Sequence, residues 1–242
     1  MSALKRFFVD KIEEVTELCG EEFEHAKNVL RLGAGDEVIL LDNSGKEYTA
    51  VIASVEKKRM ILNVVRTEVG TREALTDVCL LFGYLKNADK NEFIVQKAVE
   101  LGVKKIGVFS SEYSSAYMNA NKLERLNKIS KESAKQSGRS IAPEVVYFDT
   151  LTKAFDFVKD YKNKLFACEF ASESEKDIKS LTKGESTAII IGSEGGFSKA
   201  EAEKAQSFGF SSITLGKRIL RAETAAVSLT AIVMFSLGEM SL

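Results

Sequence analysis

Short apolar segments alternate with polar turns over the first 70 residues of the chain. These segments are rich in β-branched and aromatic residues, which favour strands. A helix is predicted over residues 20–32, and Asn-Ser-Gly at residues 43–45 is typical of a turn. The pattern predicts a small β-barrel followed by a polar linker at residues 66–76. The predicted strands are residues 7–9, 37–41, 48–54 and 60–65.

From Asp77 onward, apolar segments of strand length alternate with segments of helical periodicity. Two capping boxes are predicted to begin helices, one formed by Asp89 with Glu92 and the other by Ser198 with Glu201. Alternation of this kind predicts an α/β fold in which helices cover a parallel sheet. The predicted strands are residues 78–84, 106–109, 165–170, 187–191 and 211–215, and the helices are residues 89–101, 121–137, 223–237 and the segment from Ser198 to Gly209.

The last predicted helix, residues 223–237, is apolar on most of its sides and is therefore expected to be buried. The change of pattern near Asp77 divides the chain into two expected domains. These are a small β-barrel domain at residues 1–72 and an α/β domain at residues 73–242.

The composition is typical of a soluble globular protein and argues against several other classes. The chain has 242 residues, 45% hydrophobic and 29% charged, with a formal net charge of −1, as in a soluble globular protein. No signal peptide and no stretch of 18 apolar residues is visible, so no membrane association is expected. Three widely separated cysteines favour a reducing, cytoplasmic location. The single histidine, His25, argues against a metal site and against most histidine-dependent nucleophiles.

A glycine-rich turn follows the predicted strand at residues 187–191. Its sequence, IGSEGGF, occupies residues 191–197 and leads into a capped helix. Ligands of parallel α/β sheets bind where such turns lie, at the carboxyl ends of the strands. The spacing fits neither the dinucleotide fingerprint GxGxxG nor the P-loop GxxxxGK[ST]. On spacing alone, a tight strand–helix connection is an equally good interpretation.

A second turn, LGKRILRAETA at residues 215–225, also follows a strand and precedes a helix. Arg218 and Arg221 lie three residues apart in it, while Glu223 or Thr224 falls in the first helical turn, where an acid or a hydroxyl suits the helix dipole. In isolation these residues are interpreted as surface arginines and a helix cap. Two such turns at neighbouring strand ends favour a shared pocket.

Helices of the second domain carry candidate phosphate contacts. Lys97 shares a polar stripe with Gln96 and Glu100. The helix at residues 121–137 is basic and is continued by Arg139. Both features are more often solvated surfaces than nucleic-acid contacts.

The N-terminal domain holds a second candidate RNA contact. Arg6, His25 and Arg31 accompany Phe7 and Phe8, a combination that fits single-stranded RNA through phosphate contact and base stacking. The alternative is that the phenylalanines belong to the core and that His25 is structural.

Six strings spread over nearly the whole chain carry a resemblance to a known family. They are IGSEGGF (191–197), LGKRILRAETA (215–225), RFFV (6–9), HAKNVLR (25–31), DKNEFIVQKAVELGV (89–103) and QSGR (136–139). Together they resemble the SPOUT methyltransferases, most closely the 16S rRNA (uracil-N3)-methyltransferase family. The resemblance implies a PUA-like β-barrel that docks RNA, followed by an α/β trefoil-knot domain with a parallel sheet that binds S-adenosylmethionine (SAM).

The resemblance also implies an activity. The expected reaction is methylation of N3 of a specific uridine in 16S rRNA of the small ribosomal subunit, by a homodimer with its active sites at the subunit interface. One rival is a SPOUT enzyme that methylates a ribose 2′-hydroxyl. The other is a non-catalytic RNA-binding factor of ribosome assembly, which would not bind SAM.

Residue roles follow from the same resemblance. Arg221 is expected to stabilise charge on the uracil oxygens, and Glu223 to act as a base, to orient Arg221 or only to cap the helix. The residues expected to bind RNA are Arg6, His25, Arg31, Lys97 and Arg139. Those expected to bind SAM are Ile191, Gly192, Glu194, Gly195, Gly196, Leu215, Gly216, Leu220, Ala222, Thr224 and Ala225.

Three positions depart from the family pattern. Ser193 stands where the family usually has proline, Tyr113 where it often has arginine, and Lys135 where it has an acidic residue. Contacts carried over from the family to positions 113 and 135 are therefore not expected to hold.

Overall fold

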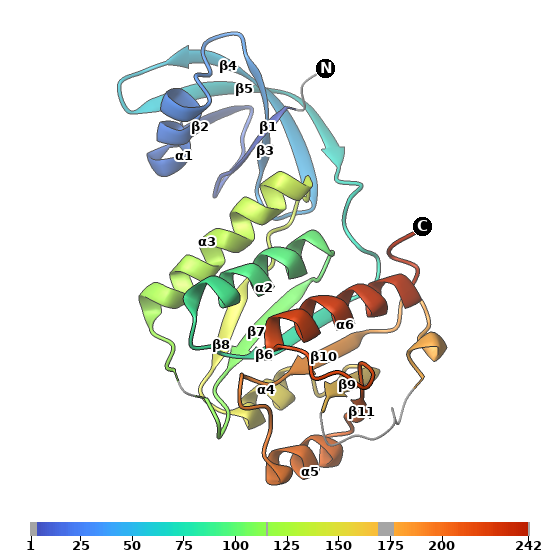
Figure 1. The fold of residues 1–242 in the computed structure, drawn as a ribbon. Helices are drawn as coiled ribbons and strands as arrows, with labels where there is room; N and C mark the ends of the chain where they lie inside the picture. The colour runs from blue at the N-terminus through green and yellow to red at the C-terminus, as the bar shows by residue number, and fades with distance from the viewer. Residues whose placement is uncertain (1–3, 115, 169–176, 242) are drawn as a thin grey trace. The chain divides into compact units, whose positions relative to one another are not determined.

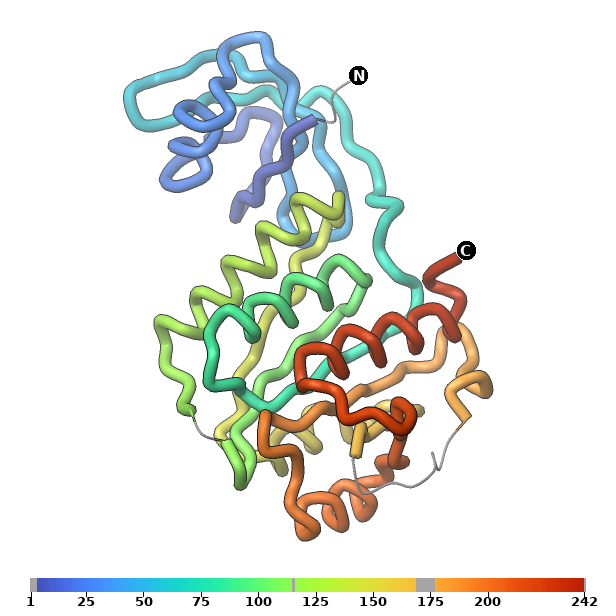
Figure 2. Tube along the Cα trace, in the orientation of Figure 1, coloured from blue at the N-terminus to red at the C-terminus, as the bar shows by residue number. Residues whose placement is uncertain are grey.

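The structure, a computed structural model, describes residues 4–114, 116–168 and 177–241. It contains two compact units, each with its own sheet (Figures 1 and 2). Unit 1 comprises the chain up to Glu73 together with Ala134–Ala142, and unit 2 comprises Ala74–Ser133 together with the chain from Pro143 onward. The segment Ala134–Ala142, which the sequence analysis assigns to the second domain, therefore packs within unit 1.

Unit 1 is a half-barrel built on a mixed five-stranded sheet of order β1-β3-β4-β5-β2. The β1 and β3 strands are parallel, and the remaining neighbours are antiparallel. A short α-helix and a π-helix follow β2 and contribute Phe23 and Ala26 to the core around Phe7. The elements are β1 (Lys5–Phe8), β2 (Val15–Cys19), α1 (Gly20–Glu24), η1 (His25–Val29), β3 (Glu37–Leu41), β4 (Lys46–Val55) and β5 (Arg59–Val69).

Two features of unit 1 differ from the sequence prediction. The β2 strand was not predicted. Its two buried residues are Thr16 and Leu18, and because threonine is polar, the sequence shows only a weak alternation of apolar residues. The predicted linker at residues 66–76 is wrong at its start, because β5 continues to Val69 and pairs there with Lys46 of β4. This end of β5 is exposed and shows no apolar alternation.

Unit 2 is built on a six-stranded sheet of order β11-β9-β10-β6-β7-β8, in which every neighbouring pair is parallel. The predicted parallel α/β sheet is thus confirmed. The strands are β6 (Val78–Gly83), β7 (Lys105–Phe109), β8 (Val145–Phe148), β9 (Asn163–Ala167), β10 (Thr187–Ile191) and β11 (Ser211–Ile213). The helices are α2 (Ala88–Glu100), α3 (Ala120–Ser137), α4 (Leu151–Phe157), η2 (Ile178–Ser180), α5 (Lys199–Ser207) and α6 (Ala222–Ser236).

Helices cover both faces of this sheet (Figure 1). The central strands β6 and β10 are buried along their whole length, as their continuous apolar sequences predict. On one face, α2 and α6 pack beside each other, and α6 also packs on β6 and β10. On the other face, Phe155 of α4 and Ala205 of α5 join Leu81 and Ile190 in an apolar core.

One of the two predicted capping boxes is confirmed. The Ser198 Oγ accepts a hydrogen bond from the Glu201 N–H at 3.2 Å, and the Glu201 carboxylate accepts one from the Ser198 N–H at 3.0 Å. The other box is wrong. The α2 helix is capped by Asn87, whose Oδ1 accepts a hydrogen bond from the Asp89 N–H at 2.9 Å, and Glu92 instead pairs with Arg125.

Other elements of unit 2 were missed or differ in their bounds from the sequence prediction. The β8 strand and the α4 helix were missed because both are short and β8 is only half-buried. The strand predicted at residues 165–170 begins at Asn163, and its predicted end lies outside the described residues. The α6 helix is not buried on most sides, since Ile232 and Phe235 are 42% and 52% exposed.

Two absences complete the description of the fold. Among the residues that the structure describes, no helix is long and apolar enough to cross a membrane. The same residues include no group of three or more histidine, cysteine, aspartate or glutamate side chains that could hold a metal ion.

Candidate active site

A cavity of about 720 Å³ lies at the carboxyl ends of β9, β10 and β11. Its walls come from the end of β9, from the β10–α5 loop that contains IGSEGGF, and from the segment that joins β11 to α6. One further residue, Lys90, comes from α2. This is the edge at which parallel α/β sheets bind their ligands, and the two glycine-bearing turns share one pocket, as the sequence predicts.

The β10–α5 loop makes a tight turn between Ser193 and Gly196. The Gly196 N–H donates a hydrogen bond to the Ser193 carbonyl at 3.0 Å, and these two residues also form an isolated β-bridge. Gly196 has a φ of +67°, a backbone conformation that glycine adopts without steric cost. The turn thus places Gly196, which has no side chain, in the wall of the pocket beside Glu194 and Phe197.

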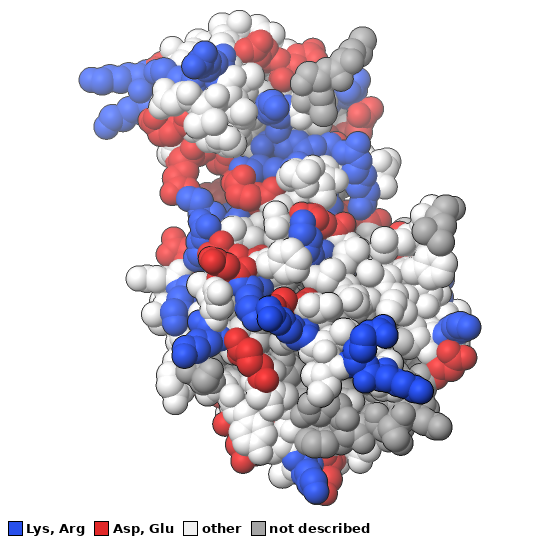
Figure 3. All heavy atoms as spheres, viewed as in Figure 1, with Lys and Arg blue, Asp and Glu red and all other residues white. Residues whose placement is uncertain are grey.

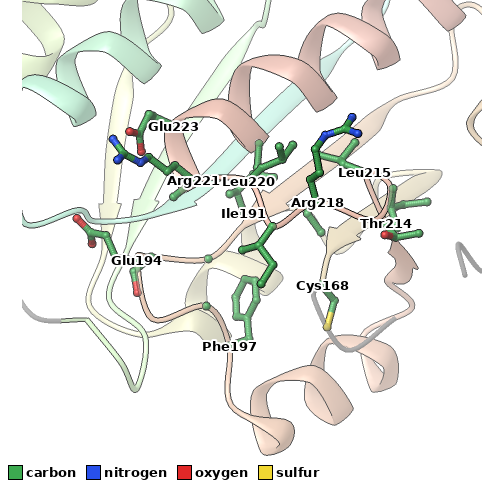
Figure 4. A pocket seen from close by; sticks show the side chains of 18 of the residues that line it. Cys168, Ile191, Glu194, Phe197, Thr214, Leu215, Arg218, Leu220, Arg221 and Glu223 are labelled. Atoms are coloured by element: carbon green, nitrogen blue, oxygen red, sulfur yellow. The ribbon is translucent and has the colours of Figure 1, made fainter. Parts of the chain in front are cut away.

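Two charged residues of opposite sign lie close together in the pocket. Figure 4 shows Arg221 and Glu223 together on one side, whereas Arg218, Thr214 and Cys168 lie on the other. Arg221 is the N-cap residue of α6 and makes no side-chain capping bond, and Glu223 lies in the first helical turn. The Lys90 ammonium lies 3.1 Å from Glu223 Oε1. Within the described residues, Glu223 Oε2 is buried and has no hydrogen-bond partner.

The surroundings of Glu223 keep its carboxyl group ionised. Burial is the largest single influence and raises the pKa of Glu223. Hydrogen bonds from its own backbone and from Lys90, together with the positive charges of Lys90 and Arg221, outweigh burial and lower the pKa below its ordinary value. A carboxylate held in this way is a good hydrogen-bond acceptor but a weaker base than an unperturbed glutamate.

Most residues predicted to bind the cofactor line this pocket. Gly195 and Thr224 are the exceptions and are not part of its wall. Glu194 lies in the wall, and its carboxylate also accepts a hydrogen bond from the Lys86 N–H at 3.0 Å. The predicted residues in the wall are Ile191, Gly192, Glu194, Gly196, Leu215, Gly216, Leu220, Arg221, Ala222, Glu223 and Ala225.

Several residues of the pocket wall were not predicted from the sequence. Lys90 lies in the first turns of α2, which begins shortly after β6, a neighbour of β10 in the sheet. The rule that ligands bind at strand ends, applied to β6 as well as to β10, was the signal that could have found it. The other residues not predicted are Ala167, Cys168, Ser193, Phe197, Ile213, Thr214, Lys217, Arg218 and Ile219.

The predicted RNA-binding residues of unit 1 differ in accessibility. Arg31 is exposed and has a φ of +56°. Arg6 pairs with Glu47 at 2.8 Å, and its second terminal nitrogen, Nη1, is buried without a partner among the described residues. His25 packs edge-on against the buried Phe7.

Arg139 is 2% exposed, and its guanidinium pairs with Glu73 at 2.7 Å. Because Arg139 is buried in this ion pair within unit 1, its charge is poorly accessible in this structure, and its predicted contact with RNA stays a prediction. Lys135, where the family has an acidic residue, forms a second such pair with Glu22.

Two of the basic residues considered as phosphate contacts in unit 2 form ion pairs. Lys97 binds Glu100 at 2.8 Å, and Arg125 of the basic helix binds Glu92 at 2.9 Å. Figure 3 shows Lys and Arg side chains interspersed with Asp and Glu on the visible face of this unit. No continuous basic surface is therefore seen on that face, which agrees with the net charge of −1.

The half-barrel of unit 1 and the parallel sheet of unit 2, with its glycine-loop pocket at the strand ends, have the folds of a PUA-like domain and of a SPOUT trefoil-knot domain. The family described as RNA methyltransferase domain matches residues 71–234, and the RNA methyltransferase PUA domain matches residues 18–65. The chain therefore belongs to the RNA methyltransferase family that includes the proteins named ribosomal RNA small subunit methyltransferase E.

Relatives of that name match nearly the whole chain. The *Bacillus subtilis* protein is 32% identical over 92% of this chain and 93% of its own length. The *Mesomycoplasma hyopneumoniae* protein is 35% identical over 93% of this chain and 96% of its own length. The *Neisseria gonorrhoeae* ribosomal RNA small subunit methyltransferase E, solved bound to S-adenosyl methionine, is 27% identical with a TM-score of 0.85, covering 96% of this chain and 98% of that one.

Proposed function

We propose that this protein transfers a methyl group from SAM to N3 of a uridine in 16S rRNA of the small ribosomal subunit. The observation that carries the proposal is the single pocket formed by both glycine-bearing turns, in a chain that belongs to this RNA methyltransferase family. Its three cysteines form no disulfide among the described residues, which supports a reducing cytoplasm as the site of this activity.

The pocket fits SAM by its chemistry. Apolar side chains such as Ile191, Leu220 and Ala225 suit the adenosine, and the main chain at Gly216, which is exposed, offers hydrogen bonds. Glu223 Oε2, which has no partner among the described residues, is available to accept a hydrogen bond from a bound ligand. When bound there, SAM supplies an electrophilic methyl group.

Methyl transfer to uridine requires that the N3 proton leave and that the negative charge on the base be stabilised. Uridine N3 becomes a good nucleophile only when it loses its proton, which passes to solvent water. N3 then bonds to the methyl carbon as the carbon–sulfur bond of the sulfonium breaks, and the resulting thioether leaves. We assign to Arg221 the stabilisation of the negative charge that develops on the uracil oxygens. Glu223 stays ionised beside Lys90 and acts as an acceptor that orients Arg221 and the ligand, which its lowered pKa favours over a role as general base.

The decisive experiment uses SAM labelled in its methyl group and small ribosomal subunits that lack the modification. Digestion of the rRNA and mass spectrometry of the nucleosides are expected to yield labelled N3-methyluridine. A labelled 2′-O-methyl nucleoside would instead support the ribose-modifying alternative. If calorimetry detects no SAM binding and no label enters the rRNA, the non-catalytic assembly factor is the better description.

We further propose that the protein acts as a homodimer. Phe93 of α2 and Ile232 and Phe235 of α6 are between 42% and 52% exposed, and their two helices pack side by side. Large apolar side chains grouped on one face are typical of subunit interfaces. This face therefore supports pairing with a second copy of the chain.

The variant Phe235→Glu is expected to weaken this dimer at least about 30-fold, because it places a charge in an apolar interface. Light scattering should give twice the chain mass of 26.7 kDa for the wild type and a value close to it for the variant. Phe157→Glu is the matched control, since Phe157 is 39% exposed on α4, on the opposite face of the sheet. A monomeric wild type, or a dimeric Phe235→Glu, would contradict the proposal.

A further inference from the structure

The loop that joins β7 to α3 holds Tyr113 in a defined position. The Ser111 N–H donates a hydrogen bond to Ser114 Oγ at 2.8 Å, and the Ser114 N–H donates one back to the Ser111 carbonyl at 3.0 Å. The Glu112 N–H donates to the carboxylate of Glu201, in the first turn of α5, at 2.9 Å. Hydrogen bonds therefore fix the residues on both sides of Tyr113.

Tyr113 packs directly on the β10–α5 loop. A Cβ atom at Gly195 would lie 2.6 Å from the Tyr113 Cβ, so only glycine permits this approach. The Tyr113 carbonyl oxygen also lies 3.5 Å from Ser193 Oγ. Gly195 stands between Glu194 and Gly196, which both line the pocket. Tyr113 is thereby placed at the rim of the pocket.

This packing nevertheless leaves the tyrosine ring open to solvent. Tyr113 is 50% exposed, although its Cβ is in tight contact with the glycine loop. A large aromatic side chain that is anchored at its base and open to solvent at its ring can stack on a planar group. The exposed ring is the feature that the proposed methyl transfer leaves unexplained.

The charges around Tyr113 indicate which part of an RNA could approach it. Glu112 precedes it in the chain, Glu201 binds the same loop, and Glu194 adjoins the glycine on which it packs. Carboxylates in these places repel phosphate but have little effect on an uncharged base. The side chain at this position is a neutral aromatic ring rather than a cation, which agrees with stacking and not with phosphate contact.

We propose that Tyr113 is a stacking platform that receives a nucleobase of the RNA substrate at the rim of the active-site pocket. The proposal rests on the proposed function, because it takes the substrate to be RNA. The base can be the target uridine on its way into the pocket or its neighbour in the strand, and both present the same planar face. Tyr113 would in either case set how the RNA enters.

The first test compares Tyr113→Ala with Tyr113→Phe. Alanine keeps the Cβ that contacts Gly195 and removes only the ring, while phenylalanine keeps the ring. We expect Tyr113→Ala to raise the Kd for protein-free 16S rRNA and the KM for methyl transfer about 5- to 150-fold, and Tyr113→Phe to restore both. Unchanged SAM affinity in both variants will show that the loop and pocket remain folded. Wild-type rRNA affinity in Tyr113→Ala would overturn the proposal.

The second test uses the absence of tryptophan from the chain. Tyr113→Trp therefore introduces a single tryptophan, whose emission can be excited apart from that of the tyrosines, and stacking on a base is expected to quench this emission when 16S rRNA is added. Tyr117→Trp is the matched control, because Tyr117 belongs to the same loop and is 79% exposed. Quenching that is no stronger at position 113 than at position 117 would overturn the proposal. A wild type that binds rRNA but transfers no methyl group would refute the proposed function, while the comparison of Kd values and the quenching test would remain valid.

Discussion

Replacing Arg221 by alanine is expected to lower kcat for methyl transfer about 100- to 1000-fold, the range found when a group that stabilises developing charge is removed from an active site. Arg221 lies beside Glu223 in the pocket wall and makes no side-chain capping bond to α6 (Figure 4). The helix should therefore tolerate its loss. The measurement is single-turnover methyl transfer to small ribosomal subunits, with SAM affinity followed by calorimetry, and SAM affinity is expected to change by less than about tenfold.

Arg218→Ala is the matched control for this experiment. Arg218 belongs to the same segment, lines the same pocket and carries the same charge, but its side chain lies on the other side of the pocket from Glu223 (Figure 4). Its removal is expected to lower kcat far less than removal of Arg221. A wild-type rate for Arg221→Ala, or equal losses in the two variants, would show that Arg221 does not have the assigned role.

The parts of the fold that could be predicted from sequence are those in which burial is strongest. The β6 and β10 strands are buried on both faces and have nearly continuous apolar sequences, so both strands and their parallel arrangement were predicted. The β8 strand lies at the edge of the sheet and is half-buried, and its sequence carries no clear period. The exposed end of β5 was taken for a linker for the same reason.

In the candidate site too, the residues with a local sequence signal were predicted and those without one were not. The two glycine-bearing turns were identified because each follows a strand, and their convergence on one pocket follows from the rule for parallel sheets. Lys90 was missed because it lies more than a hundred residues before Glu223 and only the tertiary fold brings the two side chains together. The ion pair of Arg139 with Glu73 was not predicted, because nothing in the sequence near Arg139 reveals this partner.

The environment of Glu223 predicts a second large effect, which is a fall of kcat at acid pH. Burial acts to raise the pKa of Glu223, but Lys90, the backbone of α6 and the charge of Arg221 together lower it. The carboxyl group is therefore ionised at neutral pH, and it gains its proton only as the pH falls through this lowered pKa. If Arg221 depends on an ionised Glu223, kcat should fall on the acid side of the pH profile and stay constant above it.

Glu223→Gln is expected to lower kcat about 10- to 100-fold and to remove this acid limb, because glutamine keeps an acceptor oxygen but has neither the charge nor the titration. Lys90→Met should move the acid limb to higher pH, since burial still raises the pKa of Glu223 while the cation that opposed it is gone. Lys90→Arg should return the limb toward its wild-type position. A purely structural role of Lys90 would change the amount of folded protein and leave the pH profile in place, so an unmoved limb in Lys90→Met would disprove the coupling.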